Sequence, residues 1–196
     1  MLKRSFDILV SVIFLILLFP LFILIALMVV IDSNGGIFYT QIRIARGGKD
    51  FGMLKFRTMQ TGADKKGLLT IGGRDPRVTR VGYYLRKYKF DEFPQLMNVL
   101  LGDMSLVGPR PEVRKYVDMY TEEQMKVLTV RQGITDFASI EYARESELLT
   151  GSNDPEQLYI KEIMPAKLKM NLRYVEEQSF RTDLKIIFMT IVKIWV

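Results

Sequence analysis

The sequence predicts a single-domain α+β protein, mostly helical, that is associated with a membrane through its N-terminal segment. Residues 8–31 include no charged side chain, so this stretch is apolar enough to enter a bilayer. Residues 35–59 mix aromatic and β-branched residues with glycines, which is typical of short strands. Most of the chain after residue 78 has helical character. With 196 residues, the chain has the length of one domain with an anchor.

The composition restricts the chemistry that the protein can perform. The chain contains no histidine and no cysteine, which removes the commonest general base and every thiol reaction. A catalytic base or nucleophile must therefore be Asp, Glu, Lys, Ser, Thr or Tyr. Any metal would be bound by oxygen atoms, which favours Mg²⁺ or a similar hard cation. The net charge of +6 points to acidic partners, namely phosphates, nucleic acid or an anionic membrane surface.

The apolar N-terminal segment is compatible with two membrane topologies. As one helix, residues 8–31 would be about 36 Å long, enough to cross a bilayer. Basic residues flank it on both sides, with Lys3 and Arg4 before it and a group from Arg43 to Arg57 after it. Basic flanks normally remain cytoplasmic, and Pro20 interrupts helical hydrogen bonding near the midpoint, so one interpretation is a re-entrant helix broken at Pro20. The other is a spanning helix with a proline kink.

The rest of the chain is expected to alternate helices with loops at glycines and prolines. The C-terminal stretch FRTDLKIIFMTIVKIWV carries apolar residues at helical spacing with lysines nearby. This pattern fits either an interfacial amphipathic helix or a core helix. Loops are expected where helix breakers cluster, over residues 102–112 and 133–135. Helices are predicted over residues 78–89, 91–101, 112–120, 122–130 and 154–178.

The strongest candidate for a catalytic site is the stretch LRKYKFDEFPQLMNVLLGDMSLVGPRPE. Asp91 and Glu92 are adjacent carboxylates at a predicted helix start, and Arg86, Lys87 and Lys89 lie just upstream. Nearby cations and a helix start both favour the charged form of a carboxylate. An ionised aspartate beside bound cations can act as a nucleophile on phosphorus. The structural alternative is that Asp91 is a helix N-cap and Glu92 a first-turn acid, which is the usual role of an isolated pair.

Further cations in the sequence favour a site for polyanionic substrates. Arg110 lies between Pro109 and Pro111, which restrict the local backbone and could fix its approach to a phosphate. Lys55 and Arg57 in KFRTM add two more cations. The alternative is a solvated basic face that lies on anionic lipid, and the two interpretations are compatible. A third basic group consists of Arg74, Arg77 and Arg80.

Ordered motifs follow one another along the chain, namely KRSFDILVS, the Pro20 break and FYTQIRIARGGKDFGMLKFRTM. The longest is DPRVTRVGYYLRKYKFDEFPQLMNVLLGDMSLVGPRPE, a block that is too long and too ordered to arise by chance. In these motifs the chain resembles a known family, the bacterial sugar transferases of the monotopic phosphoglycosyl transferase type. These motifs run nearly from end to end of the chain.

The resemblance implies a specific reaction and roles for specific residues. Such enzymes transfer a phospho-sugar from a UDP-sugar to a polyprenol phosphate, here expected to be undecaprenyl phosphate, and release UMP. They use Mg²⁺ and a covalent intermediate, and they catalyse the first membrane step of glycoconjugate assembly. Asp91 would be the nucleophile, Glu92 would assist the metal or the lipid phosphate, and both would be metal ligands. The expected phosphate-binding cations are Lys55, Arg57, Arg86 and Arg110.

The resemblance also implies a location and partners. Residues 1–34 would form the re-entrant membrane helix, and residues 35–196 the catalytic domain at the cytoplasmic face of the bacterial inner membrane. The partners considered are the UDP-sugar, polyprenol phosphate, membrane lipid and a second copy of the chain as a homodimer, with no nucleic acid.

The sequence departs from the family pattern at three places. The break consists of Phe19 and Pro20, whereas the family usually has Ser before the proline. Asn171 stands where the family often has Asp three residues before the tyrosine that matches Tyr174. The usual VRPGITGWAQVNGR is VRQGITDFASIEYAR in this chain, which leaves the identity of the sugar open. The replaced residues there are Gln132, Asp136, Phe137 and Ser139.

Two functions from other classes compete with the transferase. A non-catalytic scaffold on anionic lipid would account for the charge and the apolar segment, but it leaves the ordered DEFPQLMNVLLGDMSLVGPRP block unexplained. A nucleic-acid-binding protein is suggested by the net charge alone, and the membrane segment opposes it.

Overall fold

The computed structural model describes residues 2–63, 67, 69–71 and 75–195. Arg74, one of the predicted cations, lies outside these residues. In chain order the elements are α1 (Leu2–Asp32), β1 (Phe38–Ile44), η1 (Arg46–Gly48), β2 (Asp50–Phe56), α2 (Arg80–Lys87), η3 (Phe90–Glu92), α3 (Gln95–Leu101), β3 (Met104–Val107), α4 (Arg114–Val117), η4 (Gln124–Thr129), β4 (Gln132–Thr135), α5 (Phe137–Glu141), α6 (Glu145–Thr150), α7 (Pro155–Leu158), η5 (Tyr159–Ile163), α8 (Met164–Glu176) and α9 (Phe180–Trp195).

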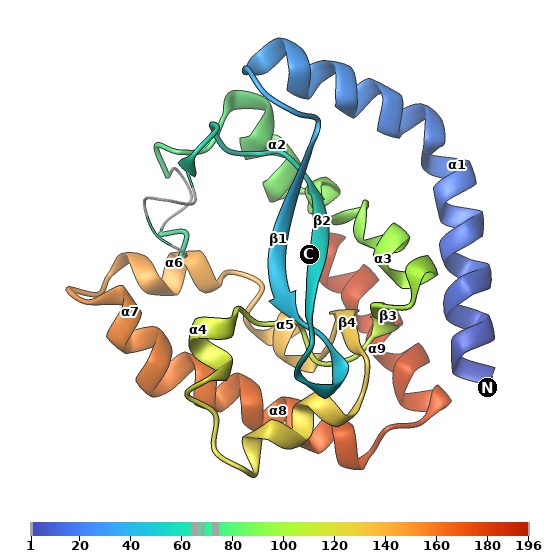
Figure 1. Cartoon of the computed structure of the whole chain (residues 1–196), viewed down its shortest axis with the longest axis vertical. Coiled ribbons are helices and arrows are strands. Elements are labelled where there is room, and N and C mark those ends of the chain that lie inside the picture. The colour runs from blue at the N-terminus through green and yellow to red at the C-terminus, as the bar shows by residue number, and fades with distance from the viewer. Residues whose placement is uncertain (1, 64–66, 68, 72–74, 196) are drawn as a thin grey trace.

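The described strands form two separate pairs. β1 and β2 make the antiparallel hairpin at the centre of Figure 1, in register from Phe38 opposite Phe56 to Ile44 opposite Asp50. This hairpin confirms the strands predicted over residues 35–59. β3 and β4 pair in parallel, although both were expected to be loops. That expectation was wrong because each strand has only four residues and lies among glycines and prolines, so its period-2 pattern is too short to recognise.

The helix expected to begin at Asp91 begins later. The helix predicted over residues 78–89 is present as the shorter α2, and Thr79 caps it by accepting from the Gly82 N–H. Asp91 then lies in the 3₁₀ turn η3, and α3 begins only at Gln95. Asp91 is therefore not the N-cap of a helix, which removes the structural alternative for this residue.

Helix α1 is long, apolar and bent. Its 31 residues are helical through Pro20 without interruption and correspond to a length of about 46 Å. Its most apolar window has a mean hydropathy of 3.3 with 11% of that window buried, so by length and composition it could cross a membrane. Figure 1 shows the helix bent along its length at one side of the molecule. The expected break at Pro20 is therefore wrong, because a proline within a helix can bend it without ending it and the chain stays helical through this residue.

The N-terminal end of α1 is fixed to the rest of the domain by polar contacts. Lys3 Nζ donates to Asp183 Oδ2 at 2.6 Å and to the Val107 carbonyl at 2.9 Å. The buried Asp7 carboxylate accepts from Ser105 Oγ at 2.8 Å. These partners lie on α9 and β3, so the start of α1 docks against elements from the second half of the chain.

The C-terminal end of α1 is fixed to a different part of the same domain. Asp32 Oδ2 accepts from the Val81 N–H in α2 at 2.9 Å. The Arg57 guanidinium lies beneath the end of the helix and donates to Ser33 Oγ at 2.5 Å, the Ser33 carbonyl at 2.8 Å and the Gly36 carbonyl at 2.5 Å. Both ends of α1 therefore contact the domain formed by the rest of the chain.

Helix α9 has one buried face and one exposed apolar face. Ile186 is fully buried in a cluster with Val107 and Tyr174. Leu184 and Phe188 are exposed. The helix thus combines features of the two predicted alternatives, since it contributes to the core and also presents apolar side chains to its surroundings.

Candidate active site

The two adjacent carboxylates of the DE pair lie in a sharp turn between α2 and α3. Lys89 adopts the left-handed conformation with φ 60° and ψ 19°, and among the described residues it is the only non-glycine with positive φ. The chain turns there and continues as η3, which carries Asp91 and Glu92 into a cavity. Asp91 is only 6% exposed. A backbone conformation that residues with side chains rarely adopt therefore positions the two carboxylates. Such conformations are common at functional sites.

Glu92 is engaged by two cations. Arg110 donates to Glu92 Oε1 in a short ion pair, and Lys55 Nζ lies 3.4 Å from the same oxygen. Burial alone would raise the pKa of Glu92, but Arg110 and Lys55 outweigh it and hold the pKa well below its usual range. Glu92 is therefore a fixed negative charge that organises the cations around it.

The surroundings of Asp91 shift its pKa in the opposite direction. Its Oδ1 is buried and has no hydrogen-bond partner among the residues that the structure describes. Burial raises the pKa of Asp91 above its ordinary value, and the neighbouring Glu92 raises it further, while Lys55 and Arg86 oppose the shift. In many active sites the surroundings shift the pKa values of two neighbouring titratable groups in opposite directions. The two groups then have different chemical roles.

Arg110 lies in the loop that follows β3 and is held in place by β4 and the residue after it. Its N–H donates to Asp136 Oδ2 at 3.0 Å, and its guanidinium donates to the Ile134 carbonyl at 2.7 Å. Gly108 and Gly133 let the two strand ends approach closely, because a Cβ on Gly133 would lie 2.1 Å from Gly108 N. The glycines and prolines of this region thus help to position Arg110 beside Glu92.

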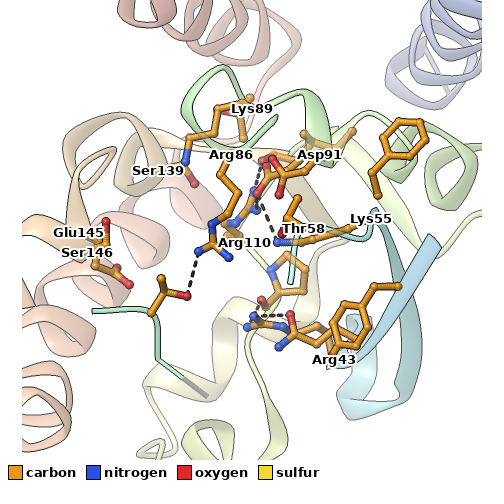
Figure 2. Close-up of a pocket in the computed structure, with 18 of the residues that line it drawn as sticks. Arg43, Lys55, Thr58, Arg86, Lys89, Asp91, Arg110, Ser139, Glu145 and Ser146 are labelled. Atoms are coloured by element: carbon orange, nitrogen blue, oxygen red, sulfur yellow. Dashed lines mark hydrogen bonds and ion pairs between the residues drawn. The ribbon is translucent and has the colours of Figure 1, made fainter. Parts of the chain in front are cut away.

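Lys55 and Arg86 complete the basic cluster. Lys55 lies on β2, and burial lowers its pKa although Glu92 opposes this effect. Arg86 lies on α2 and donates to Thr70 Oγ1 at 2.8 Å. Figure 2 shows Lys55, Asp91 and Arg110 converging from different elements, with Arg86 beside them. The structure therefore brings together Asp91, Glu92 and three of the four predicted phosphate-binding cations.

The fourth predicted cation, Arg57, also lines this cavity, but its guanidinium makes its hydrogen bonds elsewhere. Its guanidinium donates to backbone and hydroxyl oxygens at the end of α1, and the residue is only 6% exposed. Arg77 is likewise paired with Asp75, at 2.6 Å. The sequence could not separate these arginines from Arg110, because the carbonyl groups that bind Arg57 carry no sequence signal.

A polar network beside the cluster was missed by the sequence analysis. Arg43 donates to Glu112 Oε1 at 2.8 Å and to the Pro111 carbonyl at 3.2 Å. Tyr159 donates to the other oxygen of Glu112 in a short hydrogen bond. These contacts tie β1 and the helical segment near residue 159 to the loop that carries Arg110, and Figure 2 shows Arg43 below the basic cluster. Arg43 had been noted only as a charge that flanks the membrane segment.

The cluster lines a large cavity of about 1770 Å³. Its lining includes the DE pair and the basic cluster, so one part of it is strongly polar. Another part is apolar and is contributed by the two helices at the ends of the chain. These apolar residues include Phe6, Val10, Phe14 and Leu18 of α1 and Ile187 and Ile191 of α9.

The cavity thus combines a charged site with an apolar wall, and comparison with known families shows where the chain belongs. The family model described as bacterial sugar transferase matches residues 1–196. The chain belongs to the bacterial sugar transferase family. The resemblance stated from the motifs is thereby confirmed, as is the expectation of an enzyme of this type.

Curated relatives of this sugar transferase cover nearly all of its chain. It is 36% identical over 192 residues to the UDP-N-acetylgalactosamine-undecaprenyl-phosphate N-acetylgalactosaminephosphotransferase of Aeromonas hydrophila, with 96% of this chain and 42% of the relative covered. It is 36% identical over 197 residues to the UDP-glucose:undecaprenyl-phosphate glucose-1-phosphate transferase of Escherichia coli, with 98% and 40% covered. It is 38% identical over 196 residues to the uncharacterized sugar transferase EpsL of Bacillus subtilis, with 100% and 88% covered. The chain spans about two fifths of the first two relatives.

The donor set of this sugar transferase fits Mg²⁺ bound together with a phosphate substrate. Within the described part of the chain, no three acidic, histidine or cysteine side chains gather into a metal cluster. Mg²⁺ is usually held by one or two carboxylates, with substrate phosphates and water as the other ligands. Asp91 with its free oxygen and the adjacent Glu92 supply this smaller set.

Proposed function

We propose that this chain transfers a phospho-sugar from a UDP-sugar to a polyprenol phosphate, with release of UMP. The observation that carries the proposal is the buried Asp91 carboxylate beside Lys55, Arg86 and Arg110 in one cavity. The names of the Aeromonas and Escherichia relatives specify different sugars but the same acceptor, undecaprenyl phosphate. We therefore expect undecaprenyl phosphate as the acceptor and the first membrane step of polysaccharide or glycoprotein assembly as the role.

In the first step, a carboxylate oxygen of Asp91 attacks the β-phosphorus of the UDP-sugar. The bond between this phosphorus and the bridging oxygen breaks, and UMP leaves with the electron pair. The phospho-sugar remains on Asp91 as an acyl phosphate. Lys55, Arg86 and Arg110 neutralise charge on the phosphate oxygens, and the buried setting strengthens this electrostatic stabilisation.

In the second step, a phosphate oxygen of the polyprenol phosphate attacks the same phosphorus. The bond to Asp91 breaks and the carboxylate is regenerated, so the enzyme returns to its starting state. Glu92 remains charged throughout and keeps Arg110 and Lys55 oriented toward the reacting phosphates. Bound Mg²⁺, held by Asp91 and Glu92, would supply charge neutralisation to the diphosphate.

Membrane association of the enzyme at the cytoplasmic face explains how both substrates reach one site. The apolar cavity wall from α1 and α9 would give a lipid access, while the basic cluster would receive the nucleotide from water. Contacts from both ends of α1 to one domain support a re-entrant topology, in which both ends lie on the same side of the membrane. Its apolar middle would then enter one leaflet only.

The proposal is tested by measuring UMP release from a panel of UDP-sugars, with and without undecaprenyl phosphate, in detergent. We expect one or a few UDP-sugars to give sustained UMP release that requires the lipid phosphate. Chelation with EDTA should abolish this release, and added Mg²⁺ should restore it. Lipid-independent background with every UDP-sugar would instead support the non-catalytic scaffold.

A further inference from the structure

We propose that Ser139 on α5 and Asn171 on α8 bind the sugar of the nucleotide-sugar substrate and set which sugar is accepted. This inference rests on the proposed function, and it separates the cavity into a part for the phosphates and a part for the neutral sugar. Nothing in the charges of the basic cluster distinguishes one hexose from another, so discrimination must come from other groups.

Both side chains carry polar atoms that the protein leaves unsatisfied. Asn171 is 6% exposed, and neither its Oδ1 nor Ser139 Oγ makes a hydrogen bond to any described residue. A buried polar atom without a partner lowers stability by about 1–3 kcal/mol, and such atoms are rare in native proteins. Both residues line the cavity that holds Asp91. The natural interpretation is that the substrate supplies the missing partners.

Ser139 is placed next to the phosphate-binding group by one shared carboxylate. Asp136 Oδ1 accepts from the Ser139 N–H at 2.6 Å, and Asp136 Oδ2 accepts from the Arg110 N–H at 3.0 Å. Asp136 itself is fully buried and caps α5. The start of α5 and the Arg110 loop are therefore held in a fixed relation. A sugar bonded to a phosphate at Arg110 must lie close to that phosphate. Because α5 is fixed beside Arg110, its residues are placed to contact the sugar.

The second residue comes from a helix packed against the first. α8 lies against α5, which brings Asn171 to the same cavity. In Figure 2 Ser139 lies at the margin of the basic cluster, on the side away from Lys55. A hydroxyl and an amide are neutral groups that exchange hydrogen bonds with sugar hydroxyls, whereas the cations favour phosphate oxygens. A site built to hydrogen-bond a substrate hydroxyl discriminates strongly against an analogue that cannot satisfy it.

The test compares sugars that differ at a single position. For wild type, Ser139→Ala, Asn171→Leu and Asn171→Asp, kcat/KM for UMP release is measured with UDP-glucose, UDP-galactose and their N-acetylamino counterparts. The inhibition constant of UMP, which lacks the sugar, is measured with the same proteins. Asn153→Leu, at an exposed position in the loop before α7, is the matched control.

We expect Ser139→Ala and Asn171→Leu to change the ratio of kcat/KM between the preferred sugar and its closest analogue at least fivefold. Asn171→Asp, which keeps the acceptor oxygen, should retain most of the preference, and the inhibition constant of UMP should stay within twofold. Ser139→Ala removes a single oxygen atom. It therefore tests the sugar preference even if Asn171→Leu lowers the stability of the protein.

Unchanged sugar ratios in both variants would overturn the proposal. A parallel loss for every UDP-sugar together with weaker UMP inhibition would also overturn it, because the residues would then contact the nucleotide. Absence of UMP release from every UDP-sugar by the wild type would instead overturn the proposed function, so the two failures are distinguishable.

Discussion

Glu92 and Arg110 form an ion pair that joins the turn after α2 to the loop after β3, 18 residues apart in the sequence. This pair fixes the position of Glu92, and Lys55 contacts the same oxygen, Oε1. The adjacent Asp91 is left with a buried oxygen that no described residue engages. Two chemically similar neighbours are thereby assigned different roles by their surroundings.

The first prediction concerns Arg110. Arg110→Ala should lower kcat/KM for the UDP-sugar at least tenfold, about 1.4 kcal/mol in transition-state stabilisation, since a charge-assisted phosphate contact is lost. Arg110→Lys should recover only part of this loss, because lysine keeps the charge but not the planar fork. Steady-state kinetics of UMP release provide the measurement. The control is Arg114→Ala, at a partly exposed arginine near the same loop, and wild-type kinetics for Arg110→Ala would show that Arg110 is only structural.

The second prediction concerns the stability of Asp91→Asn. The pKa of Asp91 is raised above 3.8 in the folded protein, so the folded state binds the proton more tightly than the unfolded chain. The free energy of unfolding therefore falls as pH rises through the window above 3.8 and stays lower at neutral pH. Asp91→Asn removes this penalty and should raise the free energy of unfolding at pH 7 by about 1 kcal/mol, or Tm by about 2–4 °C.

Thermal unfolding in detergent across a pH series checks this gain. The difference between wild type and Asp91→Asn should shrink toward zero as the pH falls through the folded-state pKa of Asp91 to below about 4. Asp118→Asn, at an exposed carboxylate, is the matched control. A variant that is less stable than wild type at pH 7 would contradict a raised pKa for Asp91.

The third prediction concerns Arg57. Because its guanidinium satisfies oxygens at the end of α1, Arg57→Ala should lower the free energy of unfolding by about 1–3 kcal/mol. The KM for the UDP-sugar, measured on the folded fraction, should stay within twofold of wild type. Arg57→Lys should recover only part of the stability, since it cannot reach several oxygens at once. A large increase in KM with unchanged Tm would instead restore Arg57 to the phosphate-binding set.

The fourth prediction concerns the topology of α1. Both ends of the helix should lie on the cytoplasmic face, as their contacts with one domain indicate. Since the chain has no native cysteine, single cysteines at Leu2 and Gly36 can be labelled with an impermeant reagent. Both should be protected in intact cells and react once the membrane is opened. Labelling of position 2 alone from outside would establish a spanning helix, and Pro20→Ala should increase that population because it removes the bend.

The helices and strands that have long residue patterns could be predicted from the sequence. The chemistry of the site could be predicted where charged residues are clustered. The β1–β2 hairpin, α2, the segment over residues 154–178 and the grouping of Asp91 with Lys55, Arg86 and Arg110 all follow from local residue types. The parallel pairing of β3 with β4 could not be predicted, because it depends on two short segments that meet only in the folded chain. The contacts of Arg57 with the end of α1 have the same origin, since its partners are backbone carbonyls and the Ser33 hydroxyl.

The most direct test of the central claim is intact-mass spectrometry of the purified protein after incubation with the accepted UDP-sugar and Mg²⁺, without polyprenol phosphate. We predict a mass increase of one phospho-sugar on the wild type, removal of the adduct on addition of undecaprenyl phosphate, and no adduct on Asp91→Asn. Asp118→Asn should form the adduct like the wild type. If the wild type releases UMP only when both substrates are bound and no adduct forms, the transfer is direct and Asp91 is not the nucleophile.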